Sequence, residues 1–245
     1  MSMSLQTQSG AFSKTLHKPG ILTHMHVIHR LLLHFHSGPF RMYLGKALIV
    51  FCLGIILNTF GSIYATEKAS NSVTDLILSN TRVYNLDELF VYGALFVILF
   101  AMAVTLRDPK YLPFTLESIG LLYLTRSVFI TLTHLGPFPT HASLELGTVL
   151  NLVFGGGDYF FSGHTGAPFL LALLFWRDIH LRYIFLASSV ILGIVVLLTH
   201  LHYSIDVLSA FFIAFGVYHI ALWLFPQEAR LFREGLKAIA HHRSH

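Results

Sequence analysis

Two histidines that are far apart in the sequence, one of them close to an aspartate, stand at the ends of apolar segments. His164 lies in the stretch "GGGDYFFSGHTGAPF" (155–169), and His202 and Asp206 lie in "THLHYSIDV" (199–207). Asp206 follows His202 by four residues, so the two side chains share one face and can form a hydrogen bond if one helix includes both. Ionisable groups are costly inside a membrane, and their presence there indicates function.

These residue types suit transfer chemistry at phosphorus. A histidine whose ring N–H is held by a carboxylate presents its other nitrogen as an oriented nucleophile. A second histidine can protonate a leaving oxygen and later take a proton from an attacking group. The pattern predicts a phosphohistidine intermediate that needs no metal and no cofactor. A proton relay for ion or solute transport uses the same residue types, so the residues alone leave both classes open.

The composition predicts a membrane protein. Of the 245 residues, 54% are hydrophobic and 11% are charged, whereas soluble domains carry about 25% charged residues. The formal net charge is +4, but no separate run of Lys and Arg stands apart from the membrane flanks, which argues against a nucleic-acid partner. Cys52 is the single cysteine, so no intrachain disulfide can form. Nothing in the sequence specifies an oligomeric state.

The apolar segments predict an all-α, polytopic fold with six transmembrane helices. Each helix needs about 20 mainly apolar residues to cross the hydrocarbon core. The candidates are residues 44–65, 86–106, 111–135, 159–176, 182–200 and 203–225, of which the fourth contains Pro168 and is the least hydropathic. We therefore expect an N-terminal cytoplasmic tail (1–43), a six-helix catalytic membrane domain (44–226) and a C-terminal cytoplasmic tail (227–245).

The distribution of basic residues predicts the orientation. Lys and Arg concentrate in both tails and in every second loop, whereas the other loops hold only Lys68 and Arg82, and residues 136–158 hold neither type. The positive-inside rule then places both termini in the cytoplasm. His164 and His202 lie at the opposite ends of their helices, so the candidate site is expected on the non-cytoplasmic face.

Residues 21–38, "ILTHMHVIHRLLLHFHSG", combine apolar residues with histidines. We interpret this segment as an amphipathic helix lying on the membrane surface. The alternative is a metal or pH sensor formed by the histidines of the segment. These are His24, His26, His29, His34 and His36.

The motifs around the candidate site resemble those of the sphingomyelin synthase family, within the type-2 phosphatidic acid phosphatase superfamily. The family signature is Gly-Asp, three residues, Ser-Gly-His-Thr, and then His-Tyr-Thr-x-Asp-Val. This chain matches the signature through Gly157, Asp158, Ser162, Gly163, His164, Thr165, His202, Tyr203, Asp206 and Val207, with Ser204 at the usual Thr. A weaker likeness surrounds Arg126 in "LLYLTRSVFITLTHLGP" (121–137), and the resemblance covers roughly residues 86–225.

The resemblance implies a role for each matching residue. His202 would be the nucleophile oriented by Asp206, and His164 would be the general acid and then the general base. Arg126 would face the lipid phosphate, although snorkelling to the interface is the alternative. The implied substrate-binding residues are Arg126, Asp158, Ser162, Gly163 and Tyr203. For Asp158 we favour a helix N-cap over a direct contact with the head group.

A choline head group would call for an aromatic cage that binds the cation through π contacts. The aromatic residues near the mouth are Tyr159, Phe160, Phe161 and Tyr203. Anchoring at the membrane interface is the favoured interpretation for most of them.

Departures from the superfamily favour the synthase branch. No Arg-Pro dipeptide of the phosphatase type occurs, and Val196 replaces the phosphatases' Arg six residues before the second histidine. The synthases' Pro-Pro-Leu-Pro-Asp segment is also missing, and Gly156 replaces their Cys. These features indicate a compact relative of bacterial type.

The predicted function is transfer of a phospho-alcohol head group from a glycerophospholipid to a lipid alcohol such as ceramide, with membrane lipids as donor and acceptor. A phosphatase or phospholipase C-like hydrolase is the first alternative, with water as the acceptor. A transporter with a His/Asp relay is the second. The short link before the sixth helix puts His202 near the membrane surface, which disfavours a transporter.

Overall fold

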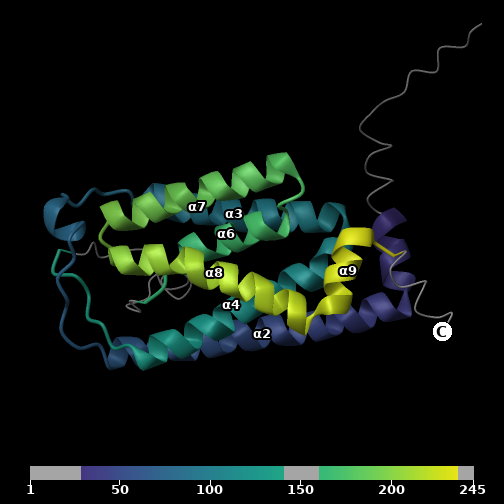
Figure 1. Cartoon of the computed structure of the whole chain (residues 1–245), viewed down its shortest axis with the longest axis horizontal. Helices are drawn as coiled ribbons and strands as arrows, with labels where there is room; N and C mark the ends of the chain where they lie inside the picture. The colour runs from purple at the N-terminus through teal and green to yellow at the C-terminus, as the bar shows by residue number, and fades with distance from the viewer. Residues whose placement is uncertain (1–28, 141–159, 237–245) are drawn as a thin grey trace, which may run out of the picture.

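The computed structural model describes residues 29–140 and 160–236, and within these ranges every regular element is a helix (Figure 1). Residues 29–36 are helical. The α-helices are α2 (Gly38–Glu67), α3 (Asp87–Arg107), α4 (Leu112–Leu132), α6 (Gly163–Leu174), α7 (Ile179–Leu198), α8 (Ser204–Leu224) and α9 (Pro226–Glu234). The short 3-10 helices η1 (Leu78–Asn80) and η2 (Pro109–Tyr111) lie in the connections. The predicted all-α class is confirmed for the described part of the chain.

Five helices in the described ranges are long and apolar enough to cross a membrane. They are α2, α3, α4 with η2, α7 and α8. Helix α6 has 12 residues, which rise about 18 Å along its axis and fall short of a hydrocarbon core about 30 Å thick. The expected fourth span, 159–176, is therefore too long. Phe161 has a φ of 61° and Ser162 is extended, so the chain turns before α6 can begin.

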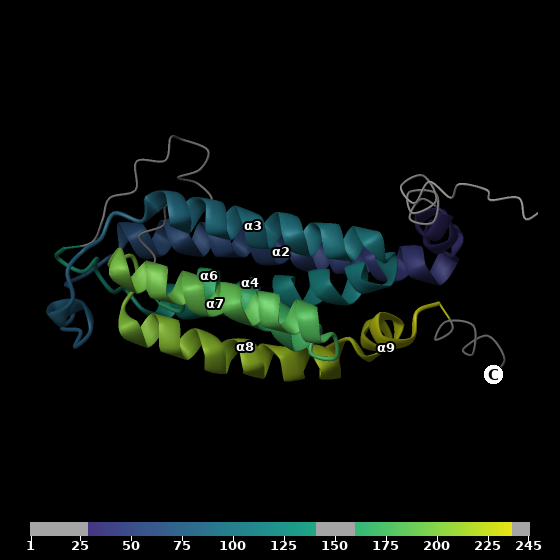
Figure 2. The same ribbon diagram turned by 90° about the horizontal axis from the view of Figure 1, so that it is seen from above.

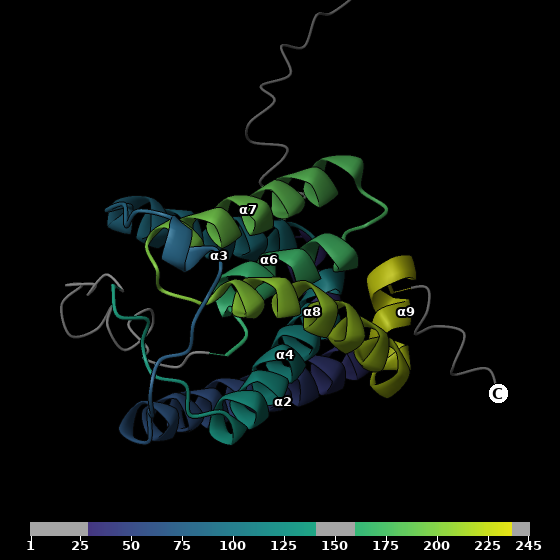
Figure 3. The same cartoon turned by 60° about the vertical axis from the view of Figure 1, so that its left-hand side comes forward.

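The long helices run along one common axis (Figure 2). Helices α2 and α4 lie side by side, away from α3 and α7 (Figure 3). The connections 68–86, 133–140 and 199–203 gather at one end of the bundle, which we call the loop end. Helix α9 and residues 29–36 lie at the other end, the α9 end (Figure 1). That the loop end faces away from the cytoplasm stays a prediction.

Helices α2 and α4 approach closely because glycines meet between them. A Cβ atom at Gly54 would collide with the carbonyl oxygen of Gly120, and one at Gly120 would lie 2.7 Å from the carbonyl oxygen of Val50. A Cβ atom at Gly61 would lie 3.3 Å from the carbonyl oxygen of Ser127. We call this glycine-lined contact the α2–α4 seam. It lets short side chains on one helix reach the other.

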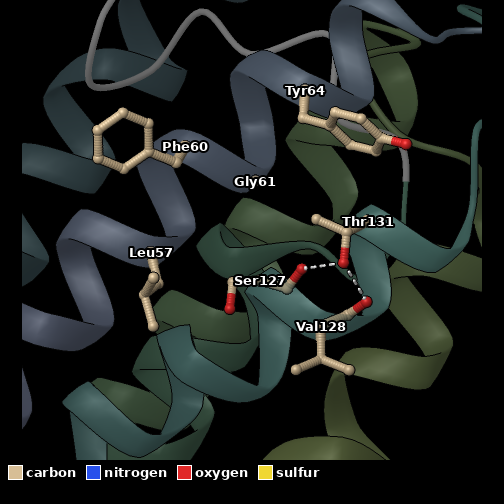
Figure 4. Close-up of a pocket in the computed structure, with 7 residues that line it drawn as sticks. All are labelled: Leu57, Phe60, Gly61, Tyr64, Ser127, Val128 and Thr131. Carbon is tan, nitrogen blue, oxygen red and sulfur yellow. Dashed lines mark hydrogen bonds between the residues drawn. The ribbon is translucent and has the colours of Figure 1, made fainter.

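An open groove of about 330 Å³ lies along this seam (Figure 4). The Thr131 hydroxyl donates hydrogen bonds to the carbonyl oxygens of Ser127 and Val128 on its own helix, at 3.0 and 2.9 Å. None of the predicted site residues lines the groove. Its lining residues are Leu57, Phe60, Gly61, Tyr64, Ser127, Val128 and Thr131. The groove is thus an apolar surface feature separate from the candidate chemistry.

A cluster of charges holds the α9 end together. The Lys46 Nζ atom lies 3.4 Å from the Glu117 Oε1 atom and 3.0 Å from the Glu228 Oε1 atom. Both glutamates are buried. The Tyr43 hydroxyl also donates to the Gln227 side-chain oxygen at 2.8 Å. These contacts tie α2, α4 and α9 to one another far from His164 and His202.

Candidate active site

The His202–Asp206 pair forms at the start of α8. His202 precedes this helix, so the pair does not lie on a continuous helical face as expected. Tyr203 is the N-cap, and its backbone N–H donates to the Asp206 Oδ2 atom at 3.0 Å. The turn brings the His202 Nδ1 atom to 3.4 Å from the same Oδ2 atom. Both side chains are buried, with 7% of His202 and none of Asp206 exposed. Distances of this kind often shorten when substrate binds.

Two consecutive backbone groups join the start of α6 to its neighbours. The Ser162 N–H donates to the Asp206 carbonyl oxygen at 3.1 Å. The Phe161 carbonyl oxygen accepts a bond from the Arg126 Nε–H at 3.1 Å. Phe161 is fully buried and adopts the left-handed conformation, with φ of 61°. Such strain costs roughly 1–3 kcal/mol for a residue other than glycine, and it clusters at functional sites.

Arg126 lies beside the first residue of α6. Its guanidinium is buried and also donates from Nη1 to the Asn58 Oδ1 atom at 3.0 Å. A Cβ atom at Gly163 would lie 3.6 Å from the Arg126 Nε atom. The N-terminus of a helix carries partial positive charge and exposed N–H groups that favour anions. Arginine and helix terminus therefore combine into an arrangement suited to a phosphate.

The remaining candidates are the N-cap of α6 and its first two residues. The His164 ring packs on Phe90 of α3, with 4.5 Å between ring centroids. Ser162 is fully buried, and its hydroxyl oxygen accepts a bond from the Thr165 hydroxyl at 3.3 Å. Gly163 stands between them, next to Arg126. Ser162, Gly163 and His164 thus lie on the element that joins Arg126 to Asp206.

The structure places the Tyr203 ring inside the protein. Its hydroxyl donates to the Gly136 carbonyl oxygen at 2.8 Å and accepts from the Val73 N–H at 3.3 Å. Tyr203 therefore ties two loops to the start of α8. Of the other aromatic residues near the mouth, Phe161 is buried and Phe160 packs on Phe129, with 5.5 Å between centroids. Asp158 and Tyr159 lie outside the described residues.

His200, which is not among the predicted site residues, anchors the turn before α8. Its Nε2 atom lies 3.2 Å from the Thr81 hydroxyl oxygen, and its Nδ1 atom lies 2.7 Å from the Thr140 hydroxyl oxygen. Its φ of 53° is the second left-handed value among described residues other than glycine. Burial lowers the pKa of His200, and the negative charge of Asp75 opposes this only in part. Burial thus favours the neutral form of the imidazole that joins these two loops.

Asp75 is a second anchor that sequence reasoning missed. Its Oδ2 atom accepts from the Ser204 N–H at 2.7 Å and from the Ser204 hydroxyl at 2.8 Å. Its Oδ1 atom accepts from the N–H groups of Ile77 and Leu78 at 2.9 and 3.0 Å. Burial alone would raise the pKa of Asp75, but these hydrogen bonds together hold the pKa below its usual value. An aspartate just before a tight turn is the sequence signal for such a role.

The N-terminal histidines show local contacts in the part that the structure describes. The Nδ1 atoms of His34 and His36 lie 2.8 and 2.7 Å from carbonyl oxygens one turn earlier. His29 is exposed, and His24 and His26 lie outside the described residues. Among residues 29–140 and 160–236, no group of three or more His, Cys, Asp or Glu is placed to hold a metal ion.

A protein-family model matches the part of the chain that contains the two histidines. The family model described as PAP2 superfamily C-terminal matches residues 155–222, which include α6, α7 and most of α8. The matched segment contains His164, His202 and Asp206, whereas Arg126 lies outside it. The match supports the type-2 phosphatidic acid phosphatase superfamily and, with the apolar helices, a multi-pass membrane enzyme of the lipid phosphatase or phosphotransferase kind. No curated protein matches the chain.

Proposed function

We propose that this protein is a membrane-embedded head-group transferase, which moves a phospho-alcohol from a glycerophospholipid to a lipid alcohol such as ceramide. The observation that carries the proposal is the buried His202–Asp206 pair. It is joined through Ser162 and Phe161 to the Arg126 guanidinium. The proposed site faces the non-cytoplasmic side, and both substrates are lipids of the surrounding bilayer.

In the first step, the His202 Nε2 atom attacks the phosphodiester phosphorus. Asp206 lies at the other ring nitrogen and stabilises the positive charge that the ring gains. The bond between phosphorus and the diacylglycerol oxygen breaks, and His164 donates a proton to that oxygen. The products are diacylglycerol and a phosphohistidine that carries the head group.

In the second step, the acceptor hydroxyl attacks the same phosphorus. His164, now neutral, takes the hydroxyl proton, and the bond between phosphorus and His202 breaks. Arg126 and the N-terminus of α6 stabilise the negative charge on the phosphoryl oxygens in both transition states. The two histidines require opposite protonation states in the first step, so activity is expected to peak between two titrations.

The test is a lipid assay on purified protein in vesicles. Labelled phosphatidylcholine or phosphatidylethanolamine is supplied with and without ceramide, to wild type and to His202→Ala. The matched control is His219→Ala, which removes an exposed histidine of α8 that bonds to its own helix at Phe215. We expect a new phospholipid only with ceramide, no product from His202→Ala and nearly unchanged activity in His219→Ala.

The other outcomes separate the alternatives. Equal release of head group or phosphate without ceramide would make the protein a hydrolase that uses the same residues. Turnover that survives His202→Ala would overturn the phosphohistidine mechanism. Solute flux without turnover of either lipid would instead support transport.

A further inference from the structure

We infer that Asn58 of α2 is a positioning residue for the phosphate-binding guanidinium of Arg126. This inference rests on the proposed function. Helix α2 lies outside the segment matched by the family model and carries none of the predicted site residues. The Asn58 Oδ1 atom nevertheless accepts a hydrogen bond from the Arg126 Nη1 atom at 3.0 Å. Through this contact α2 becomes part of the active site.

Asn58 differs from two threonines in the same helix. The hydroxyls of Thr59 and Thr66 donate to carbonyl oxygens of α2 itself, at 2.9 and 2.8 Å. Such bonds satisfy a hydroxyl inside an apolar helix without any contact to a neighbouring helix. An amide is costly in hydrocarbon unless it finds partners on a neighbouring helix. The Asn58 side chain finds one on α4, and that partner is the buried arginine.

The α2–α4 seam makes this contact possible. Gly54 precedes Asn58 by about one helical turn and Gly61 follows it by about one turn. Both glycines allow the α4 backbone to come close, and Figure 4 shows Gly61 and Ser127 on the two helices of the seam. A short amide therefore reaches the guanidinium of the residue just before Ser127. Larger residues at the glycine positions would move Asn58 out of reach.

Two bonds in different directions then fix the plane of the guanidinium. The Phe161 carbonyl oxygen holds the Nε–H, and the Asn58 amide oxygen holds Nη1. These two acceptors are neutral, so they orient the guanidinium without placing a negative charge beside it. An aspartate at position 58 would accept the same bond but would add a negative charge that competes with a phosphate for the guanidinium.

The first experiment compares Asn58→Leu and Asn58→Asp with the control Thr59→Val in steady-state kinetics with the lipid donor. Loss of an acceptor to a charged donor lowers kcat/KM by about tenfold. We expect that loss in Asn58→Leu, a loss at least as large in Asn58→Asp, and a change below about twofold in Thr59→Val. Thermal unfolding of each variant checks that the fold is retained.

A double-mutant cycle tests whether Asn58 acts through Arg126. We expect Asn58→Leu to cause no further loss of kcat/KM in an Arg126→Gln background, because the bond is already gone. A general structural role would give the same loss in both backgrounds, and that result would overturn the inference. So would full activity of Asn58→Leu and Asn58→Asp together.

Binding without turnover separates this inference from the proposed reaction. Phosphatidic acid and diacylglycerol are titrated into wild type and Asn58→Leu in lipid nanodiscs. Weaker binding of phosphatidic acid alone in the variant supports the positioning role even if no transfer product forms. Equal binding of phosphatidic acid by the two proteins would overturn it, whatever the lipid assays show.

Discussion

Both ends of the helix bundle bury charged side chains, but they satisfy them differently. At the α9 end, Lys46 pairs directly with the carboxylates of Glu117 and Glu228. At the loop end, Arg126 is held by the oxygens of Asn58 and Phe161, which are neutral. The two carboxylates offset the charge of Lys46, whereas these two acceptors orient the Arg126 guanidinium without adding charge beside it. The α9 end is thus held by opposite charges, and the binding of a phosphate by Arg126 at the loop end stays a prediction.

The backbone shows the same contrast. Phe161 and His200 are the described non-glycine residues with positive φ, and both lie next to the candidate chemistry. No such residue occurs at the described α9 end, where helices meet through ion pairs and packed aromatic rings such as Tyr111 and Phe232. Strain at the loop end is held in place by buried hydrogen bonds to the surrounding loops. This is the pattern expected of a preorganised site.

The largest expected effect is the loss of activity when an amide replaces the Asp206 carboxylate at the loop end. The same replacement at the α9 end provides the comparison. Asp206→Asn keeps an oxygen for the Tyr203 N–H but removes the charge that supports His202. We expect kcat/KM to fall about a hundredfold or more. Glu117→Gln makes the same chemical change at the α9 end and should alter kcat/KM by less than about threefold. Lipid turnover by the two purified variants measures the contrast, and equal losses would show that the two ends are not functionally distinct.

The second effect comes from a methyl group added to the α2–α4 seam. Gly54→Ala places a Cβ atom against the Gly120 carbonyl, so α2 must shift and carry Asn58 away from Arg126. We expect kcat/KM to fall about tenfold and the unfolding temperature to drop. Gly45→Ala on the same helix is the control, because its Cβ atom meets nothing within 4 Å. Gly45→Ala should stabilise the helix by up to about 1 kcal/mol. An equal loss of activity in Gly45→Ala and Gly54→Ala would show that the loss does not come from the α2–α4 seam.

The helices were largely predictable because hydropathy reports directly on membrane spans. The expected stretch 86–106 became Asp87–Arg107, and 203–225 became Ser204–Leu224. The fourth span was wrong in length because its first residues form the strained turn at Phe161. Hydropathy treats that segment as apolar and carries no information on backbone conformation.

The site was predictable only where the residues themselves are reactive. The spacing predicted that the His202 and Asp206 side chains lie close together. The structure brings them together at the N-cap of α8 and not along one helical face. Asn58 and Asp75 are polar residues that belong to no motif. Their roles follow from their contacts with Arg126 and Ser204, which are distant in the sequence. Such contacts arise from the packing of α2 on α4 and of the loop before α3 on α8, and a single sequence does not encode that packing in any local pattern.

The third prediction concerns the tie at the α9 end. Lys46→Met leaves two buried carboxylates without their cation, so the free energy of unfolding should fall by roughly 1–2 kcal/mol. The value is modest because the Lys46 side chain is 48% exposed and solvent screens its charge. Thermal unfolding in detergent measures the loss, while kcat/KM should stay within about twofold. A second change, Glu117→Gln in the same variant, should recover part of the stability, and a large loss of turnover in Lys46→Met would contradict a purely structural role.

The smallest expected effect is a pH dependence of stability that comes from His200. Burial lowers the pKa of this imidazole in the folded protein, so the unfolded chain binds a proton more readily. Stability from this residue is therefore complete above the unfolded pKa of about 6.5 and is lost as the pH falls below that value. His200→Gln can still contact the hydroxyls of Thr81 and Thr140 but does not titrate. The unfolding temperature of wild type should thus fall more steeply below pH 6.5 than that of His200→Gln.

A substitution of exposed His219 isolates the contribution of His200. His219→Gln removes a histidine that bonds only its own helix among the described contacts, and its unfolding temperature should follow the wild-type curve across the same pH range. Parallel curves for wild type and His200→Gln would mean that the two threonines hold a charged imidazole as well as a neutral one. Such a result would show that charging His200 does not weaken the turn before α8.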